Sequence, residues 1–91
     1  MVDVVYELGF TGVSIEKLGR RGISPAEALQ VPGNRYVILP NPPSPSRRLL
    51  IGATNGGRTI TLVVERTPEP ADWLIVSGWD SPSHERKMLW R

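Results

Sequence analysis

The sequence of 91 residues contains no cysteine and a single histidine. Without cysteine the chain cannot form disulfides, use a thiol nucleophile or bind zinc through thiolates, and one histidine cannot make a histidine-rich metal site. We therefore expect neither a bound metal nor a cofactor. Because covalent cross-links are excluded, the fold must be stabilised by the burial of apolar side chains.

Long apolar runs are also missing. None approaches the roughly 20 residues that a membrane-spanning helix requires. Residues 2–10, VDVVYELGF, lack the basic region and the long apolar core of a signal peptide. We therefore expect a soluble cytoplasmic protein without membrane contact. The length suits one domain, residues 1–91, with a core that is feasible but not large.

Charge of one sign does not dominate. The net charge is +2, with four basic and four acidic side chains in residues 1–45 and seven and five in residues 46–91. A nucleic-acid-binding surface usually shows a denser basic patch, although clustered arginines can create a local positive potential without a large net charge. Composition is thus compatible with RNA as a ligand and does not require it.

The clearest local pattern lies at residues 47–66, where Asn55-Gly56 separates two apolar runs rich in β-branched residues. Asn-Gly is typical of a type I′ hairpin turn, which needs a positive φ at both central residues. The pattern therefore predicts a β-hairpin with a two-residue loop. The pairs expected across it are Ile51 with Ile60 and Leu49 with Leu62. One face would then be apolar and the other mixed.

A short helix is predicted over residues 15–20. Ser14 is a suitable N-cap, and Gly22 stands where a left-handed glycine ends many helices. Three basic side chains at spacing i, i+3 and i+4 share one face of this helix. They are Lys17, Arg20 and Arg21. We consider them candidates for RNA binding; the alternative is a solvated basic face near the helix C-terminus.

A second short helix is predicted over residues 23–31, because Ser24 and Glu27 match a capping box and Pro25 fits the first helical position. The remaining elements are predicted as strands at 2–6, 35–39 and 72–79, a stiff proline-rich connection at 40–46 and a final helix at 84–91.

The final helix is expected to be capped by Asp80 or Ser81 and to dock Met88 and Leu89 on the sheet. The order of elements predicts an α+β fold, with an antiparallel sheet of about four strands, two short N-terminal helices and one C-terminal helix. We expect the helices largely on one side of the sheet.

Several segments together resemble a known family. Residues 19–28, GRRGISPAEA, are similar to the N-terminal signature of BrnT-type toxins, and residues 48–66 resemble the family's central hairpin. Residues 73–77, Glu85-Arg86 and Trp90 resemble its closing strand and helix. The resemblance implies a RelE-like fold and a bacterial or phage toxin of a type II toxin–antitoxin module. It also implies a metal-independent endoribonuclease that acts on RNA and is neutralised by an antitoxin-like protein.

Arginine is the residue type that carries this chemistry, because a guanidinium binds a phosphodiester in a bidentate manner and stabilises charge in its transition state. The resemblance gives Arg48, Arg58 and Arg66 as catalytic candidates and adds Arg86 to the RNA-binding ones. Arginine is a poor base, so Glu65 and His84 are the candidates for proton transfer.

Two positions depart from the family pattern. Arg21 stands where the family usually has histidine, and Trp79 stands where it usually has arginine. Three alternatives therefore remain open. The hairpin arginines can act as solubility gatekeepers that bracket apolar strands. The chain can be a catalytically lapsed homologue that binds a protein. It can also be a plain structural domain within an assembly.

Overall fold

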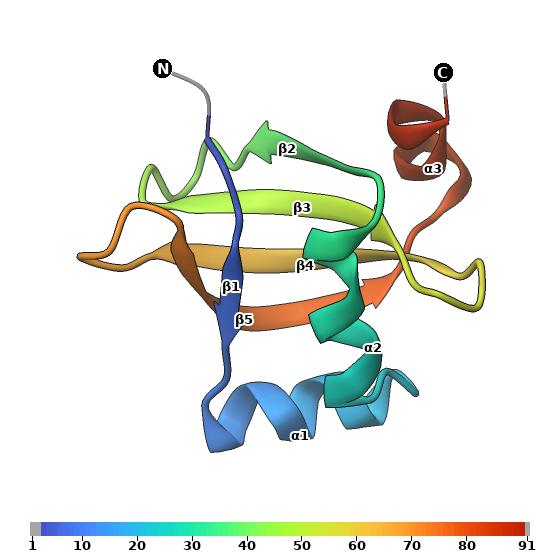
Figure 1. Cartoon of the computed structure of the whole chain (residues 1–91), viewed down its shortest axis with the longest axis horizontal. Coiled ribbons are helices and arrows are strands. Elements are labelled where there is room, and N and C mark those ends of the chain that lie inside the picture. Colours follow the sequence, from blue (N-terminus) through green and yellow to red (C-terminus); the bar gives the residue numbers. More distant parts are fainter. Residues whose placement is uncertain (1–2, 91) are drawn as a thin grey trace.

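The computed structural model describes residues 3–90, which form one five-stranded sheet and three helices (Figure 1). In chain order the elements are β1 (Glu7–Gly9), α1 (Gly12–Arg20), α2 (Pro25–Gln30), the 3-10 helix η1 (Val31–Gly33), β2 (Tyr36–Pro40), β3 (Arg47–Ala53), β4 (Thr59–Arg66), β5 (Asp72–Asp80) and α3 (Ser83–Leu89). The α+β class predicted from the sequence is confirmed.

The sheet has the strand order β1-β5-β4-β3-β2, and it is mixed because β1 runs parallel to β5 while the other pairs are antiparallel. The predicted antiparallel sheet of about four strands was therefore wrong in detail. The first strand lies at Glu7–Gly9 and not at 2–6, of which residue 2 is outside the described part. The segment that precedes β1 crosses over the sheet, where Val5 is buried and its N–H donates to the Tyr36 hydroxyl at 3.3 Å.

The central hairpin forms, but its register is shifted by one residue from the prediction. Leu50 pairs with Leu62 and Ile51 pairs with Thr61. The cause is a three-residue loop, 55–57, in which Gly57 has a φ of +87° and the other two residues have a negative φ. This is a type I turn followed by a left-handed glycine, which replaces the predicted type I′ turn. A one-residue shift moves each side chain of one strand to the other face.

Neighbouring strand residues point to opposite faces, so Leu50 and Ile51 define the two sides of the sheet. The side with Leu50 is covered by α1, α2 and the segment before β1, and it holds the larger buried cluster, including Leu18, Ala28 and Trp73. The other side, with Ile51, is covered in part by α3. The expectation that the helices lie largely on one side holds for α1 and α2 and fails for α3. Figure 1 shows α2 in front of the sheet, α1 along the β5 edge and α3 beyond one end of β3.

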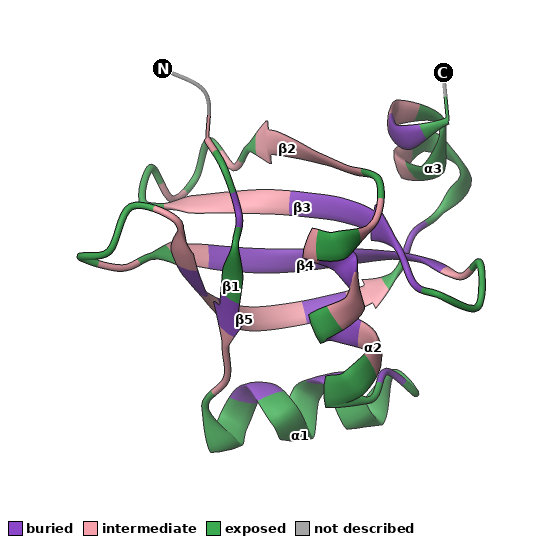
Figure 2. Ribbon diagram, viewed as in Figure 1, coloured by how far each residue is buried: buried purple, intermediate pink, exposed green. Residues whose placement is uncertain are grey.

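Burial is concentrated in the central strands. Six of the eight residues of β4 are buried, and the tip of the hairpin and most of α1 are exposed (Figure 2). Apolar side chains removed from water contribute about 25 cal/mol for each Å² that is buried, so the four buried apolar residues of β4 contribute to the stability of the fold. Within residues 3–90, no helix is long and apolar enough to cross a membrane.

Helix boundaries follow the predicted capping signals in part. The Ser24–Glu27 capping box at α2 and the left-handed Gly22 after α1, with a φ of +69°, are confirmed. Helix α1 begins earlier than predicted, because Thr11 is its N-cap and Ser14 completes that capping box from the third helical position.

Helix α3 docks on the sheet as predicted, with Leu89 buried and Met88 packed against the same cluster. Its predicted side-chain cap was wrong, because Pro82 occupies the N-cap and makes no such hydrogen bond. Ser81 instead shares a hydrogen bond with Thr61, and Asp80 pairs with Arg58.

Candidate functional site

Arg58 joins three elements through its guanidinium group. Its Nε and Nη2 donate to the two Asp80 carboxylate oxygens at 2.7 and 3.0 Å, and its Nη1 lies 3.2 Å from Glu27 Oε2. It also donates to the carbonyls of Gly22 at 2.8 Å and Arg21 at 3.3 Å. Arg58 thus connects the start of β4 with the end of β5, the start of α2 and the turn after α1.

These contacts change the acidity of both carboxyl groups. The hydrogen bond from Arg58 lowers the pKa of Asp80 below its ordinary value of 3.8. The backbone hydrogen bond from Ser24, followed by the contact with Arg58, lowers the pKa of Glu27 below 4.5. Both carboxylates are therefore fully charged near neutral pH, and they balance the charge of Arg58.

Acid is expected to weaken the fold through these carboxylates. A lowered folded-state pKa adds stability that is present above the unfolded-state pKa and is lost as the pH falls toward the folded-state value. The free energy of unfolding in urea should therefore hold from pH 7 to about 5 and fall between about pH 5 and 3. In Asp80→Asn the fall should be smaller. An equal fall in both proteins would contradict this assignment.

Arg48 and Arg66 share one carboxylate at the other end of the hairpin. Arg48 Nε donates to Asp3 Oδ2 at 2.9 Å, and Arg66 Nη2 donates to Asp3 Oδ1 at 2.8 Å. The Arg66 guanidinium also lies over the Trp73 ring, 4.9 Å from its centroid. Burial raises the pKa of Asp3, but the hydrogen bonds from Arg66 and Arg48 outweigh it and the net pKa is lowered.

The three arginines predicted as catalytic are thus not brought together. Arg58 precedes β4 and Arg66 ends it, so their backbones lie roughly 25 Å apart at about 3.3 Å per residue. Each of the three guanidinium groups has a carboxylate partner, as a structural role for these residues would require. One phosphate cannot contact both ends of this strand.

The two proton-transfer candidates lie elsewhere. Glu65 Oε1 accepts from Arg47 Nε at 3.3 Å and from Ser46 Oγ at 3.2 Å. His84 lies on α3 with its side chain 80% exposed, and its Nε2 is 3.6 Å from Glu85 Oε2. The structure does not bring these two residues together with the catalytic candidates.

Glu85 belongs to a separate polar cluster that fixes α3 to the sheet. The buried Thr61 hydroxyl lies 2.8 Å from Ser81 Oγ and donates to Glu85 Oε1, which also accepts from Trp79 Nε1 at 2.9 Å. Trp79, which stands where the BrnT pattern has arginine, therefore supports the position of a helix.

Three of the predicted RNA-binding residues do come together. Lys17, Arg20 and Arg21 line a pocket of about 260 Å³ whose fourth lining residue is Ser77 of β5. Arg86, the fourth predicted residue, lies on α3 and does not line it. The pocket therefore combines one face of α1 and the turn that follows it with one residue of β5.

Close packing of α1 on β5 forms this pocket. Leu18 is fully buried and packs over Gly78, where an added Cβ would lie only 2.7 Å from Leu18 Cδ2. A glycine within a strand often marks such a close approach. Because Gly78 lets the helix approach, α1 lies close enough to β5 for Ser77 to line the pocket beside the basic residues. Sequence reasoning missed Ser77, and the glycine after it was the available signal.

The pocket carries an excess of positive charge. Arg20 Nη2 lies 2.5 Å from Glu16 Oε1, an exposed pair that is largely screened by solvent. Within residues 3–90, Lys17 and Arg21 have neither an ion pair nor a side-chain hydrogen bond. The partial negative charge at the C-terminus of α1 stabilises these cations and offsets only part of their potential. Three cations and one carboxylate leave a net charge of +2 at the pocket.

Among the described residues, no group of three or more acidic or histidine side chains could hold a metal ion. The chain matches no protein-family model, no curated protein and no solved structure. The case for a function therefore depends on the geometry of this pocket and on the motifs of the sequence.

Proposed function

We propose that this chain is a small RNA-binding domain of the BrnT/RelE toxin type, and that the pocket of Lys17, Arg20, Arg21 and Ser77 holds an RNA phosphate. The observation that carries the proposal is the gathering of three cationic residues around one pocket, where Lys17 and Arg21 have no carboxylate partner within residues 3–90. We call these four residues the basic pocket.

The chemistry of the basic pocket suits a phosphodiester. Guanidinium groups bind phosphate oxygens in a bidentate manner, and lysine adds a point charge. The phosphate backbone supplies most of the non-specific affinity of proteins for nucleic acids. A site of this kind recognises the charge of RNA more than its sequence.

The basic pocket supports binding better than cleavage. Its four lining residues include no carboxylate and no histidine. The pocket can therefore stabilise negative charge, but it has neither of the side-chain types that most often accept a proton as a general base. The three arginines predicted to be catalytic favour the same conclusion. Each guanidinium is already paired with a carboxylate of this chain and is therefore less available to an RNA phosphate. A domain that binds RNA without cleaving it is therefore the preferred form of the proposal. Ribonuclease activity and an antitoxin-like partner remain predictions from the resemblance.

Two matched double variants test the basic pocket. Lys17→Gln with Arg21→Gln removes two charges from the pocket, and Arg86→Gln with Lys87→Gln removes two from the last turn of α3. Binding is measured by the fluorescence anisotropy of a labelled single-stranded RNA at low salt. We expect the pocket variant to bind RNA more weakly, by a factor of about ten or more. A lost phosphate contact means that fewer counterions are released from the RNA on binding. The α3 variant should keep nearly the wild-type affinity.

The comparison separates a site from a general charge effect, because both variants lower the net charge equally. Similar losses in the two proteins would show that RNA responds to total charge alone. A larger loss in the α3 variant would move the contact to Arg86, where the BrnT pattern places it. Either result would overturn the basic pocket as the phosphate site.

A further inference from the structure

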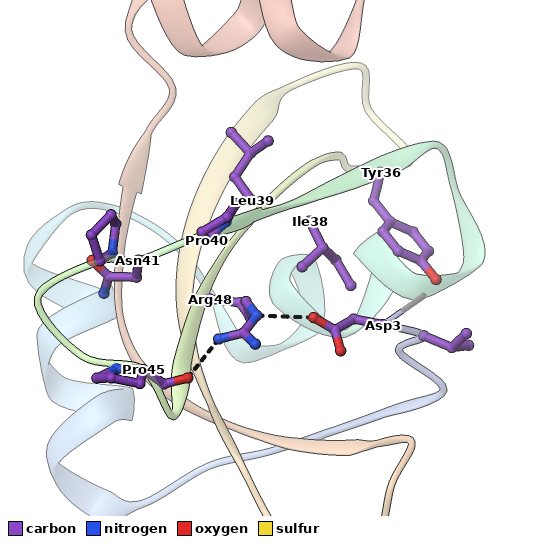
Figure 3. A pocket seen from close by; sticks show the side chains of 10 residues that line it. Asp3, Tyr36, Ile38, Leu39, Pro40, Asn41, Pro45 and Arg48 are labelled. Atoms are coloured by element: carbon purple, nitrogen blue, oxygen red, sulfur yellow. Dashed lines mark hydrogen bonds and ion pairs between the residues drawn. The ribbon is translucent and has the colours of Figure 1, made fainter. Parts of the chain in front are cut away.

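A second and larger cavity lies at the β2 edge of the sheet. The basic pocket lies at β5, toward the other end of the strand order. The volume of this second cavity is about 810 Å³, within the range of roughly 300–1,000 Å³ that is usual for small-molecule sites. Figure 3 shows it between β2, the proline-rich connection that follows β2, and the N-terminal segment. It shares no residue with the basic pocket.

The fold leaves this cavity unfilled for an identifiable reason. β2 is the last strand of the sheet, and its Tyr36 and Ile38 point to the same side as Leu50, because Ile38 pairs with Leu50. Helix α2 and η1 cover this side farther along the sheet. Prolines at 42, 43 and 45 prevent the connection from forming a ladder that would close the edge. Ile38, Val4 and Pro40 therefore form apolar walls around an open space.

The polar side of the cavity offers donors. Arg48 uses Nε for Asp3 and Nη1 for the carbonyls of Pro45 and Arg47, which leaves Nη2 without a hydrogen bond to residues 3–90. The Tyr36 hydroxyl accepts from Val5 N–H, so its own proton is available. The Asn41 amide also lines the cavity and makes no side-chain hydrogen bond in the described part of the chain.

A cluster with a net positive charge borders the cavity. Asp3 is the one carboxylate among the described lining residues, and its two oxygens already accept from Arg48, which lines the cavity, and from Arg66, which does not. Two guanidinium groups and one carboxylate give this cluster a net charge of +1. With the acceptors of Asp3 engaged and several donors free, an incoming anion finds partners that an incoming cation does not.

We propose that this cavity binds a small organic acid, in which an aromatic or branched apolar body lies against Ile38 and Val4 and a carboxylate accepts from Arg48 Nη2. Charge complementarity and apolar walls together define this ligand class. A carboxylate oxygen can accept a charge-assisted hydrogen bond from the free Nη2 of Arg48, which gives it an advantage over a neutral acceptor. The inference is independent of RNA binding, because no residue is shared.

Three probes separate the contributions of charge and apolar body. Benzoate carries both, benzamide carries the body without the charge, and acetate carries the charge without the body. Binding is followed by amide chemical shifts in two-dimensional NMR. We expect saturable shifts at Tyr36, Ile38, Asn41 and Arg48 with benzoate, and binding at least about tenfold weaker with benzamide or acetate. The amide signals of Lys17 and Arg21 should not shift.

Two variants and a control locate the site. Ile38→Trp fills the cavity from a partly exposed position, and Arg48→Met removes the charge while Asp3 keeps Arg66. Both should abolish the benzoate shifts with the fold retained. Arg47→Met removes the same charge from the next residue, on the opposite side of β3, and should bind benzoate normally. Equal binding of benzoate and benzamide, no saturable response to benzoate, or unchanged binding in Ile38→Trp would overturn the proposal.

Discussion

Gly78→Ala is expected to lower the free energy of unfolding by about 1–3 kcal/mol. The new methyl carbon would lie 2.7 Å from Leu18 Cδ2, 2.8 Å from Leu62 Cδ2 and 3.0 Å from the Thr61 carbonyl oxygen. Leu18 and Leu62 are fully buried, so neither can move aside without displacing its own neighbours. The clash should push α1 away from β5.

The same substitution is expected to weaken RNA binding, because displacement of α1 separates its basic side chains from Ser77. Urea unfolding and RNA anisotropy on the same protein preparation measure both effects. Gly19→Ala is the matched control: it adds the same methyl group in α1, where no atom lies within 4 Å. That control should gain about 0.5–1 kcal/mol from helix propensity. A Gly78→Ala protein with wild-type stability would contradict the close packing described here.

Arg58→Met is expected to cost about 1–2 kcal/mol of folding free energy. Loss of one partner from a buried ion pair costs about 3–5 kcal/mol, but the Asp80 side chain is 64% exposed and solvent screens its pair with Arg58. The Arg58 side chain is 28% exposed, and its removal leaves Asp80, Glu27 and the carbonyls of Gly22 and Arg21 without this donor. Thermal and urea unfolding measure the change.

Arg47→Met provides the control for this substitution. Arg47 has one carboxylate partner, Glu65 at 3.3 Å, and both side chains are more than a third exposed, so its loss should cost less than about 0.5 kcal/mol. RNA binding by Arg58→Met distinguishes a structural role of Arg58 from a phosphate-binding role. If the role is structural, the variant should keep most of the wild-type RNA affinity at a temperature where it is folded. If Arg58 binds phosphate, the variant should lose that affinity, and this result would favour the catalytic assignment predicted from the sequence.

Local signals in the sequence predicted local structure well. The capping box at Ser24 and Glu27 and the left-handed Gly22 were confirmed because each depends on residues within one helical turn. The shared basic face of Lys17, Arg20 and Arg21 follows from helical spacing alone, and the structure brings these residues to one pocket. Such features need no knowledge of the rest of the chain.

Pairings between distant residues were harder to predict. The hairpin register was wrong by one residue because Asn55-Gly56-Gly57 fits two loop types, and the second glycine decides between them. The parallel pairing of β1 with β5 and the partners of Arg58 depend on the packing of segments far apart in the chain. Ser77 was missed for the same reason, since its neighbours come from a helix more than fifty residues earlier.

The salt dependence of RNA binding tests the basic pocket most directly. For single-stranded nucleic acid, the logarithm of the binding constant falls with the logarithm of the salt concentration by about 0.7 for each phosphate contact. If the pocket holds one phosphate, the variant with Lys17→Gln and Arg21→Gln should have a slope smaller by about 0.7, the value for one contact. The variant with Arg86→Gln and Lys87→Gln should keep the wild-type slope. A pocket variant whose slope equals that of the wild type would contradict the account.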